Sequence, residues 1–255
     1  MFLRLRQLCL VARQLEPVVD DLRAVFDLSV CHRDPAVGKF GLHNALLPIG
    51  NFFIEIVAPI QPNTTAERYL ERRGGDGGYM VILDCDDLDR WQAHVDAIGV
   101  RVAAALSNDE YRGLQLHPRD TGGALLEINW TRGGGPIDGP YNPAGPNWQA
   151  HVRTELAQSV AAAVLQSDDP ERLARRWGQV LQRPVAKAED GFELAVDNAL
   201  LRFVPVRDGR GEGLGGIDVR VTSPQRVRER AQARGLAVNG DCVHIGGVRF
   251  RLIGP

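Results

Sequence analysis

The sequence predicts an α+β fold that is built from four copies of one βαβββ unit. Four apolar strand-like runs are each followed by an amphipathic helix and then by shorter strand candidates. Segments of different copies also match: Asn51-Phe-Phe-Ile-Glu-Ile-Val resembles Asn198-Ala-Leu-Leu-Arg-Phe-Val, and Ala97-Ile-Gly-Val-Arg-Val resembles Ala233-Arg-Gly-Leu-Ala-Val. Because each repeated sheet must bury one face, we expect the copies to pair.

The first two copies occupy residues 1–60 and 78–132. In the first, we expect a strand over 3–12, a helix over 15–28, and strands near 29–33, 42–48 and 52–58. In the second, we expect a strand from Gly78, a helix over 88–98 that ends at Gly99, and strands near 101–105, 114–117 and 124–130. Between them, Thr64 has the position of an N-cap for a short extra helix.

The last two copies follow a stretch rich in Gly and Pro. Residues 133–150 predict a linker, so the expected domains are 1–132 and 151–255. In the third copy, we expect a strand near 160–166, a helix over 169–181, and strands near 185–188, 192–196 and 199–204. In the fourth, we expect a strand from 216, a helix over 224–234, and strands near 236–238, 242–245 and 248–253.

The amino-acid composition limits the classes of protein to which the chain could belong. The chain of 255 residues has 44% hydrophobic and 24% charged residues, which is typical of a globular protein. Its net charge of −2 argues against nucleic acid or an anionic membrane as the main partner. The four cysteines have no CxxC spacing, and no apolar run reaches the length of a membrane span. We therefore expect a cytoplasmic location.

Two apolar strands carry one carboxylate each. Glu55 is at the centre of Asn51–Pro59, and Glu127 has the same setting in Gly123–Trp130. Burial of a charge costs several kcal/mol unless the charge is paired or bound to a metal. Each Glu is therefore either paired with Arg or backbone donors, or is a metal ligand or a general base.

The repeat and its strand motifs resemble the vicinal oxygen chelate (VOC) superfamily, which includes glyoxalase I, bleomycin-resistance proteins, methylmalonyl-CoA epimerase and extradiol dioxygenases. The residues that carry the resemblance are Gln7–Ala12, Phe53–Pro59 and Leu116–Glu127. The resemblance implies that the four modules pair into two glyoxalase-like barrels, with a cleft in the N-terminal one.

Site residues follow from the resemblance by position. The ligand positions of the N-terminal barrel fall on Gln7, Glu55, Met80 and Glu127. Gln7, Glu55 and Glu127 would suit one divalent ion (Mg, Mn, Ni or Zn), whereas the thioether of Met80 is a poor ligand for a hard cation. The same two glutamates are the candidate catalytic residues.

The remaining candidates line the same cleft in this interpretation. Gln7, His43, Tyr79 and His117 are the expected substrate-binding residues, although a structural hydrogen bond is the favoured role of His117. In the C-terminal barrel the carboxylate positions hold Arg202 and Arg251, which cannot ligate a metal. We expect no metal there, and we expect these arginines to pair with nearby carboxylates.

Four functions stay open, the last of which is a barrel pair that is kept only as an interaction scaffold. The first is lyase or isomerase chemistry on a small oxygen-rich metabolite, with a Glu removing a proton next to a carbonyl. The second is a binding protein that sequesters a small molecule, as bleomycin-resistance proteins do. The third, an extradiol-type dioxygenase, is disfavoured because no histidine occupies a ligand position. A homodimer is expected as the assembly.

Overall fold

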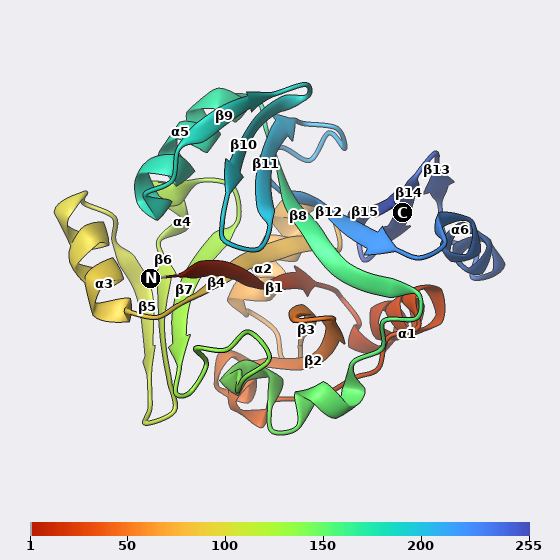
Figure 1. The fold of residues 1–255 in the computed structure, drawn as a ribbon, viewed down its shortest axis with the longest axis horizontal. Coiled ribbons are helices and arrows are strands. Elements are labelled where there is room, and N and C mark those ends of the chain that lie inside the picture. The colour runs from red at the N-terminus through yellow and green to blue at the C-terminus, as the bar shows by residue number, and fades with distance from the viewer. Residues whose placement is uncertain (1) are drawn as a thin grey trace. The chain divides into compact units, whose positions relative to one another are not determined.

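A computed structural model describes residues 2–255 and shows the mixture of strands and helices that the sequence predicts (Figure 1). The first module comprises β1 (Leu3–Val11), α1 (Leu15–Phe26), β2 (Leu42–Ile49) and β3 (Phe52–Pro59). The helix α2 (Thr65–Arg73) follows it. The second module comprises β4 (Gly77–Cys85), α3 (Leu88–Ala97), β5 (Val102–Ser107), β6 (Tyr111–Leu116), α4 (Pro118–Thr121) and β7 (Leu125–Thr131).

The second half repeats this order. The third module comprises β8 (Ala157–Ser167), α5 (Pro170–Leu181), β9 (Val185–Ala188), β10 (Gly191–Ala195) and β11 (Leu200–Pro205). The fourth comprises β12 (Gly213–Val221), α6 (Pro224–Ala233), β13 (Val238–Asn239), β14 (Cys242–Ile245) and β15 (Val248–Ile253). The predicted α+β class and its four-module organisation are confirmed.

One predicted strand of the first module is wrong. The segment 29–33 contributes a single β-bridge, at His32. The chain turns directly afterwards, because the side chain of Asp34 accepts a hydrogen bond from the backbone N–H of Ala36 at 2.8 Å. The short 3-10 helix η1 (Pro35–Phe40) begins there, and the fixed φ of its proline suits a turn.

Local helix signals place two boundaries as predicted. The hydroxyl of Thr64 accepts a hydrogen bond from the backbone N–H of Glu67 at 3.0 Å, which caps α2. At the end of α3, Gly99 has a φ of 68°, in the left-handed region where glycine is unstrained.

The described strands form two sheets. The order is β2-β3-β1-β4-β7-β6-β5 in the seven-stranded sheet and β13-β14-β15-β12-β8-β11-β10-β9 in the eight-stranded sheet. In the last three modules the first strand pairs in parallel with the last: β4 with β7, β8 with β11 and β12 with β15. The β6 and β7 strands are antiparallel, with Gln115 opposite Glu127.

Contacts divide the chain into two compact units. Unit 1 comprises Met1–Gln7, Tyr79–Asn142 and Ala162–Gly215, and unit 2 comprises Leu8–Gly78, Pro143–Ala161 and Gly216–Pro255.

Each unit joins segments that are distant in sequence. In unit 1 the indole N–H of Trp177 donates to the carbonyl of Gly122 at 3.3 Å, so α5 is fixed against the turn after α4. In unit 2, α1 contacts α6, and the rings of Phe26 and Phe250 lie 5.4 Å apart.

The Gly- and Pro-rich stretch 133–150 is anchored to the folded core. It contains the short 3-10 helices η2 (Asn142–Ala144) and η3 (Trp148–His151), and the side chains of Tyr141 and Trp148 are buried. The domain boundaries expected from the sequence stay a prediction, and Met1 of the first expected domain lies outside the described residues. Within residues 2–255, no helix has both the length and the apolar character that a bilayer-spanning helix needs.

Candidate functional site

Glu127 occupies the middle of β7 in unit 1, between two neighbouring strands. It lies opposite Ile82 of β4 and opposite Gln115 of β6. Residues that face each other across a sheet project to the same side, so the side chains of Glu127, Gln115 and Ile82 share one face. Glu127 is only 3% exposed, and a carboxylate this deeply buried requires partners.

Its partners are neutral hydrogen-bond donors. The phenol of Tyr111 and the amide N–H of Asn129 donate to Oε1, the latter at 3.3 Å. The amide N–H of Gln115 donates to Oε2 at 2.9 Å. Among residues 2–255, no Arg, Lys or His pairs with Glu127. The carboxylate is thus held by three donors while its charge is not cancelled by a cation.

A second tyrosine extends this network to β1. The phenol of Tyr141 donates to Oε1 of Gln7 at 3.0 Å, and Nδ2 of Asn129 lies 3.4 Å from the Tyr141 oxygen. Gln7, Tyr141, Asn129 and Glu127 are all buried. Two of the residues predicted from the sequence, Gln7 and Glu127, therefore belong to one connected hydrogen-bond network. We name this network, which comprises Gln7, Tyr111, Gln115, Glu127, Asn129 and Tyr141, the Glu127 network.

Burial keeps both tyrosines protonated. Desolvation raises the pKa of Tyr111 and of Tyr141 well above the ordinary value of a phenol, and the nearby charge of Glu127 adds to both shifts. Each phenol is therefore a fixed donor at neutral pH. Gln115 is half-buried, whereas the other members are buried.

Glu55 has its own setting in unit 2. It lies in β3 opposite Leu46 of β2 and is 7% exposed. The amide N–H of Asn44 donates to Oε1 of Glu55 at 2.7 Å. The amide oxygen of Asn44 in turn accepts from the backbone N–H of Asp34 at 2.7 Å, which fixes the orientation of the amide. Asn44 thus acts as a positioned neutral donor to Glu55.

The other predicted substrate-binding residues have different settings. His43 is exposed near the start of β2, and Tyr79 is half-buried in β4. Nδ1 of His117 accepts from the backbone N–H of Arg119 at 3.2 Å and thereby caps α4, which is the structural hydrogen bond favoured for it. A substrate-binding role for His43, Tyr79 and His117 stays a prediction.

The residues beside Glu127 supply few further metal ligands. The three neutral donors leave one acceptor position of the carboxylate, on Oε2, for a cation. Met80, at the other expected ligand position of this unit, offers only a thioether. Within the described part of the chain, no group of three or more His, Cys, Asp or Glu side chains is arranged to hold a metal ion.

The arginines of the second half pair with local carboxylates, as expected. Nε of Arg251 donates to Asp218 at 2.9 Å, and a second bond joins the same two side chains. Arg202 lies 3.9 Å from Asp190.

Sequence reasoning missed Tyr111, Gln115, Asn129 and Tyr141. Asn129 could have been predicted from the sequence, because it lies two residues after Glu127 and its side chain therefore points to the same face of the strand. Gln115 and Tyr111 required the register between β6 and β7, which is a long-range property. Tyr141 follows the glycine-rich segment and carries no periodic signal.

Comparison with known families agrees with the predicted VOC resemblance. A family model described as "Glyoxalase-like domain" matches residues 8–181, which is more than half of the chain. The chain therefore belongs to the glyoxalase-like domain family. The search of curated proteins found no significant match.

Solved structures align with all or about half of this chain. A hypothetical protein from Staphylococcus aureus aligns over 100% of both chains with a TM-score of 0.71 and 12% identity. A methylmalonyl-CoA epimerase variant from Streptomyces coelicolor, in complex with 2-nitronate-propionyl-CoA, aligns with 51% of this chain and 99% of its own, with a TM-score of 0.47 and 21% identity. The epimerase from Mycobacterium tuberculosis aligns with 50% of this chain and 87% of its own, with a TM-score of 0.45 and 22% identity.

Proposed function

We propose that this protein is a lyase or isomerase that acts on a small oxygen-rich metabolite, with Glu127 as the general base. The observation that carries the proposal is the partner set of Glu127. Its donors are neutral, so no cation competes for the carboxylate lone pair that would accept a proton. A catalytic role for Glu55, which Asn44 holds in unit 2, stays a prediction from the sequence.

The proposed step is proton abstraction from a carbon next to a carbonyl. Oε1 of Glu127 is held by Tyr111 and Asn129, so Oε2, whose donor Gln115 is half-buried, takes the proton. The electron pair of the C–H bond moves into the enolate of the substrate. Return of the proton to the former carbonyl carbon, while the α-hydroxyl passes its own proton to the enolate oxygen, completes an isomerisation. Expulsion of a leaving group from the β-carbon instead completes a lyase reaction. Gln7 is proposed as a neutral donor to a substrate oxygen.

A divalent metal at Gln7, Glu55 and Glu127 stays a prediction from the resemblance. No step above depends on it. A cytoplasmic location and a homodimer are likewise predictions, which cell fractionation and sedimentation of the purified protein would test.

Solvent exchange of substrate protons tests the proposal. The protein is incubated in D₂O with a panel of α-hydroxy carbonyl compounds and acyl thioesters, and deuterium at the α-carbon is followed by NMR. We expect Glu127→Gln to slow exchange by at least about 100-fold, the scale of general-base catalysis. The control is Glu229→Gln, which removes an exposed carboxylate from α6 and should leave the rate unchanged.

Two outcomes would contradict the proposal. One is exchange by Glu127→Gln at the wild-type rate. The other is saturable binding of a panel compound without exchange by the wild type, which would favour a protein that sequesters its ligand. Thermal unfolding of each variant shows whether a lost rate reflects a lost fold.

A further inference from the structure

Gly113 lies in the interior of β6, where a glycine is unfavourable. It is buried, and it pairs with Leu106 of β5 and with Asn129 of β7. A glycine in a strand interior loses more conformational entropy on folding than other residues and offers no side chain to pack. The φ of Gly113 lies outside the left-handed region, so its backbone conformation does not require glycine. The reason for this glycine therefore lies in the atoms that surround its Cβ position.

A Cβ at position 113 would meet both ends of one hydrogen bond. It would lie 3.1 Å from Oη of Tyr111, 3.2 Å from Oε1 of Glu127 and 3.4 Å from Cε1 of Tyr111. Oη of Tyr111 is the donor to that same oxygen of Glu127. The first two distances are shorter than the 3.4–4 Å of an ordinary contact, and both side chains are buried in close-packed surroundings. A side chain at position 113 would therefore press on this hydrogen bond.

The register of the strands explains why the phenol runs across Gly113. Gln115 lies directly opposite Glu127, whereas Tyr111 lies opposite Thr131. Gly113 is between Tyr111 and Gln115 on the same face of β6, because side chains alternate along a strand. The ring of Tyr111 must therefore lean along β6, over Gly113, to bring its hydroxyl to Glu127. An aromatic ring that covers a strand glycine also stabilises the strand at that position.

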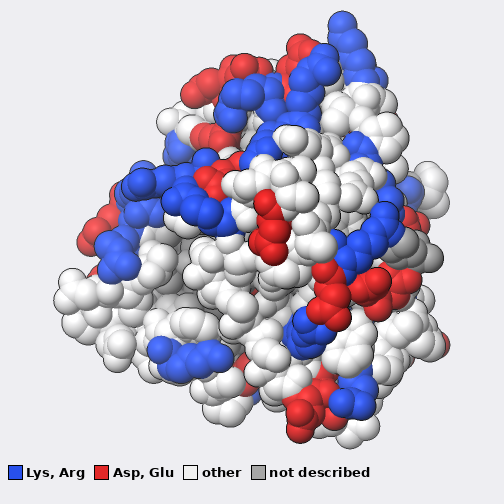
Figure 2. All heavy atoms as spheres, turned by 90° about the vertical axis from the view of Figure 1, so that its left-hand side faces the viewer, with Lys and Arg blue, Asp and Glu red and all other residues white. Residues whose placement is uncertain are grey.

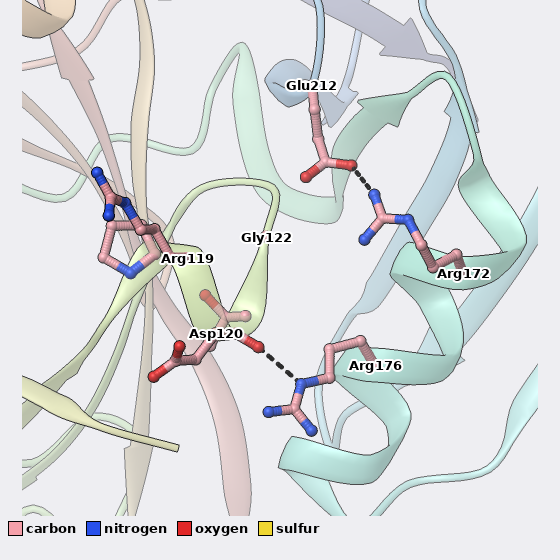
Figure 3. Close-up of a pocket in the computed structure, with 8 residues that line it drawn as sticks. Arg119, Asp120, Gly122, Arg172, Arg176 and Glu212 are labelled. Atoms are coloured by element: carbon pink, nitrogen blue, oxygen red, sulfur yellow. Dashed lines mark hydrogen bonds and ion pairs between the residues drawn. The ribbon is translucent and has the colours of Figure 1, made fainter. Parts of the chain in front are cut away.

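A second glycine of unit 1 lies close to a carboxylate for a different reason. Gly122 borders a pocket of about 460 Å³ that residues of α4 and α5 line together with Glu212. Figure 3 shows Gly122 at the turn after α4 and shows Glu212 paired with Arg172 of α5. A Cβ at Gly122 would lie 2.8 Å from Oε1 of Glu212, but the φ of Gly122 is 71°, so the backbone by itself requires glycine. Gly113 has no such requirement, and its neighbours alone explain it.

The orientation of Glu127 depends on its neutral donors. Most of the Asp and Glu side chains on the face shown in Figure 2 lie beside Lys or Arg, whose charge attracts a carboxylate from many directions. Tyr111 is instead a directional donor, and a hydrogen bond weakens steeply when its angle is poor. A group that displaces the phenol therefore changes how Oε1 of Glu127 is held.

We propose that Gly113 is a positioning residue of the Glu127 site. Because Gly113 has no Cβ, the phenol of Tyr111 lies along β6 and holds Oε1 of Glu127, which leaves Oε2 to take the proton in the reaction proposed above. The effect on catalysis rests on that proposed function, whereas the positioning of Tyr111 does not.

Proton NMR of the full chain tests the positioning without any substrate. The hydroxyl proton of a buried phenol that donates to a carboxylate exchanges slowly with water and gives a resolved downfield signal, which its loss in Tyr111→Phe identifies. We expect Gly113→Ala to shift or abolish this signal, because the added methyl displaces the phenol. The matched control is Gly38→Ala, which should leave the signal unchanged, since Gly38 is exposed and has open space around its Cβ position.

The deuterium exchange described above tests the effect on catalysis. Tyr111→Phe and Gly113→Ala should each lower kcat about tenfold while KM changes less than about twofold, because the substrate still binds but the base is misplaced. In the Tyr111→Phe background, Gly113→Ala should slow exchange by no more than about twofold, because the hydrogen bond that it disturbs is already absent. Folding of Gly113→Ala only in the Tyr111→Phe background would support the proposal in the same way.

Any of three results overturns the proposal. The first is a hydroxyl signal of Gly113→Ala at the wild-type position. The second is an equal loss of rate from Gly113→Ala in the wild-type and Tyr111→Phe backgrounds. The third is failure of Gly113→Ala to fold in both backgrounds, since the clash would then not involve the hydroxyl of Tyr111. If the wild type exchanges no substrate proton, the function proposed above fails, while the hydroxyl signal still decides whether Gly113 positions Tyr111.

Discussion

Tyr111 of β6 donates a hydrogen bond through its phenol to Oε1 of Glu127 on β7, and both side chains are buried. A buried carboxylate in an apolar strand is commonly paired with a cation, but here a neutral group takes that place. The raised pKa of Tyr111 keeps its proton on the phenol, so the direction of the hydrogen bond is fixed. The negative charge of Glu127 is therefore stabilised without being cancelled.

Removal of the Tyr111 hydroxyl should lower the free energy of unfolding. Tyr111→Phe leaves Glu127 with two donors, and we expect the free energy of unfolding to fall by about 1.5–3 kcal/mol, as for a hydrogen bond to a charged group. Tyr141→Phe removes a neutral bond to Gln7 and should cost about 1 kcal/mol. Urea unfolding of both variants measures the difference. Equal losses would mean that Tyr111 does not serve a charged partner.

Arg4 and Asp84 form an ion pair, and substitutions of the two residues should have strongly non-additive effects on the free energy of unfolding. The two side chains share bonds of 3.0 and 2.6 Å in a buried setting, and Arg4 also donates to the carbonyls of Gly134 and Gly135. A double-mutant cycle with Arg4→Met and Asp84→Asn should give a coupling energy of at least about 2 kcal/mol.

An exposed pair on α5 provides the control for that cycle. Arg175 and Glu171 lie 2.6 Å apart at the surface, and their coupling should not exceed about 0.5 kcal/mol. Coupling energies of similar size in the two cycles would show that burial does not strengthen the Arg4 pair.

Gly123 should resist substitution for two reasons. Its φ is 71°, and a Cβ would lie 2.8 Å from Cδ2 of the buried Leu165. Gly99 has a similar φ of 68° but open space around the Cβ position. Gly99→Ala should therefore cost about 1 kcal/mol from backbone strain alone, and Gly123→Ala should cost at least about 1 kcal/mol more from overpacking. Thermal unfolding of the two variants isolates the steric contribution, and equal costs would exclude it.

Cys31 and Cys85 should be unreactive in the native protein near neutral pH. Burial raises the pKa of Cys31 to about 12 and that of Cys85 to about 12. Because the thiolate is the nucleophile, only about one thiol in 10⁴ is reactive at pH 8. Labelling with a disulfide reagent should accelerate about tenfold per pH unit below pH 12, and all four thiols should react in urea. Fast labelling at pH 8 that Cys31→Ser abolishes would contradict the raised pKa of Cys31.

The sequence by itself determined the four modules, their helices and most of their strands, because apolar periodicity and caps such as Thr64 are local properties of the chain. The sequence also identified Glu55 and Glu127 as candidate site residues, since a single carboxylate in an apolar strand can be recognised without knowing how that strand pairs. The strand predicted over 29–33 is absent, because the chain turns at Asp34 and Pro35 despite the strand-like pattern of that segment.

Only the tertiary structure decided what surrounds each carboxylate. The donors Tyr111 and Gln115 reach Glu127 through the pairing of β6 with β7, and Tyr141 reaches Gln7 from a segment without periodicity. The pocket that residues of α4 and α5 line likewise joins two modules that are separated in sequence. Hydrogen-bond partners depend on which distant residues are brought within about 3 Å, and no local pattern encodes that distance.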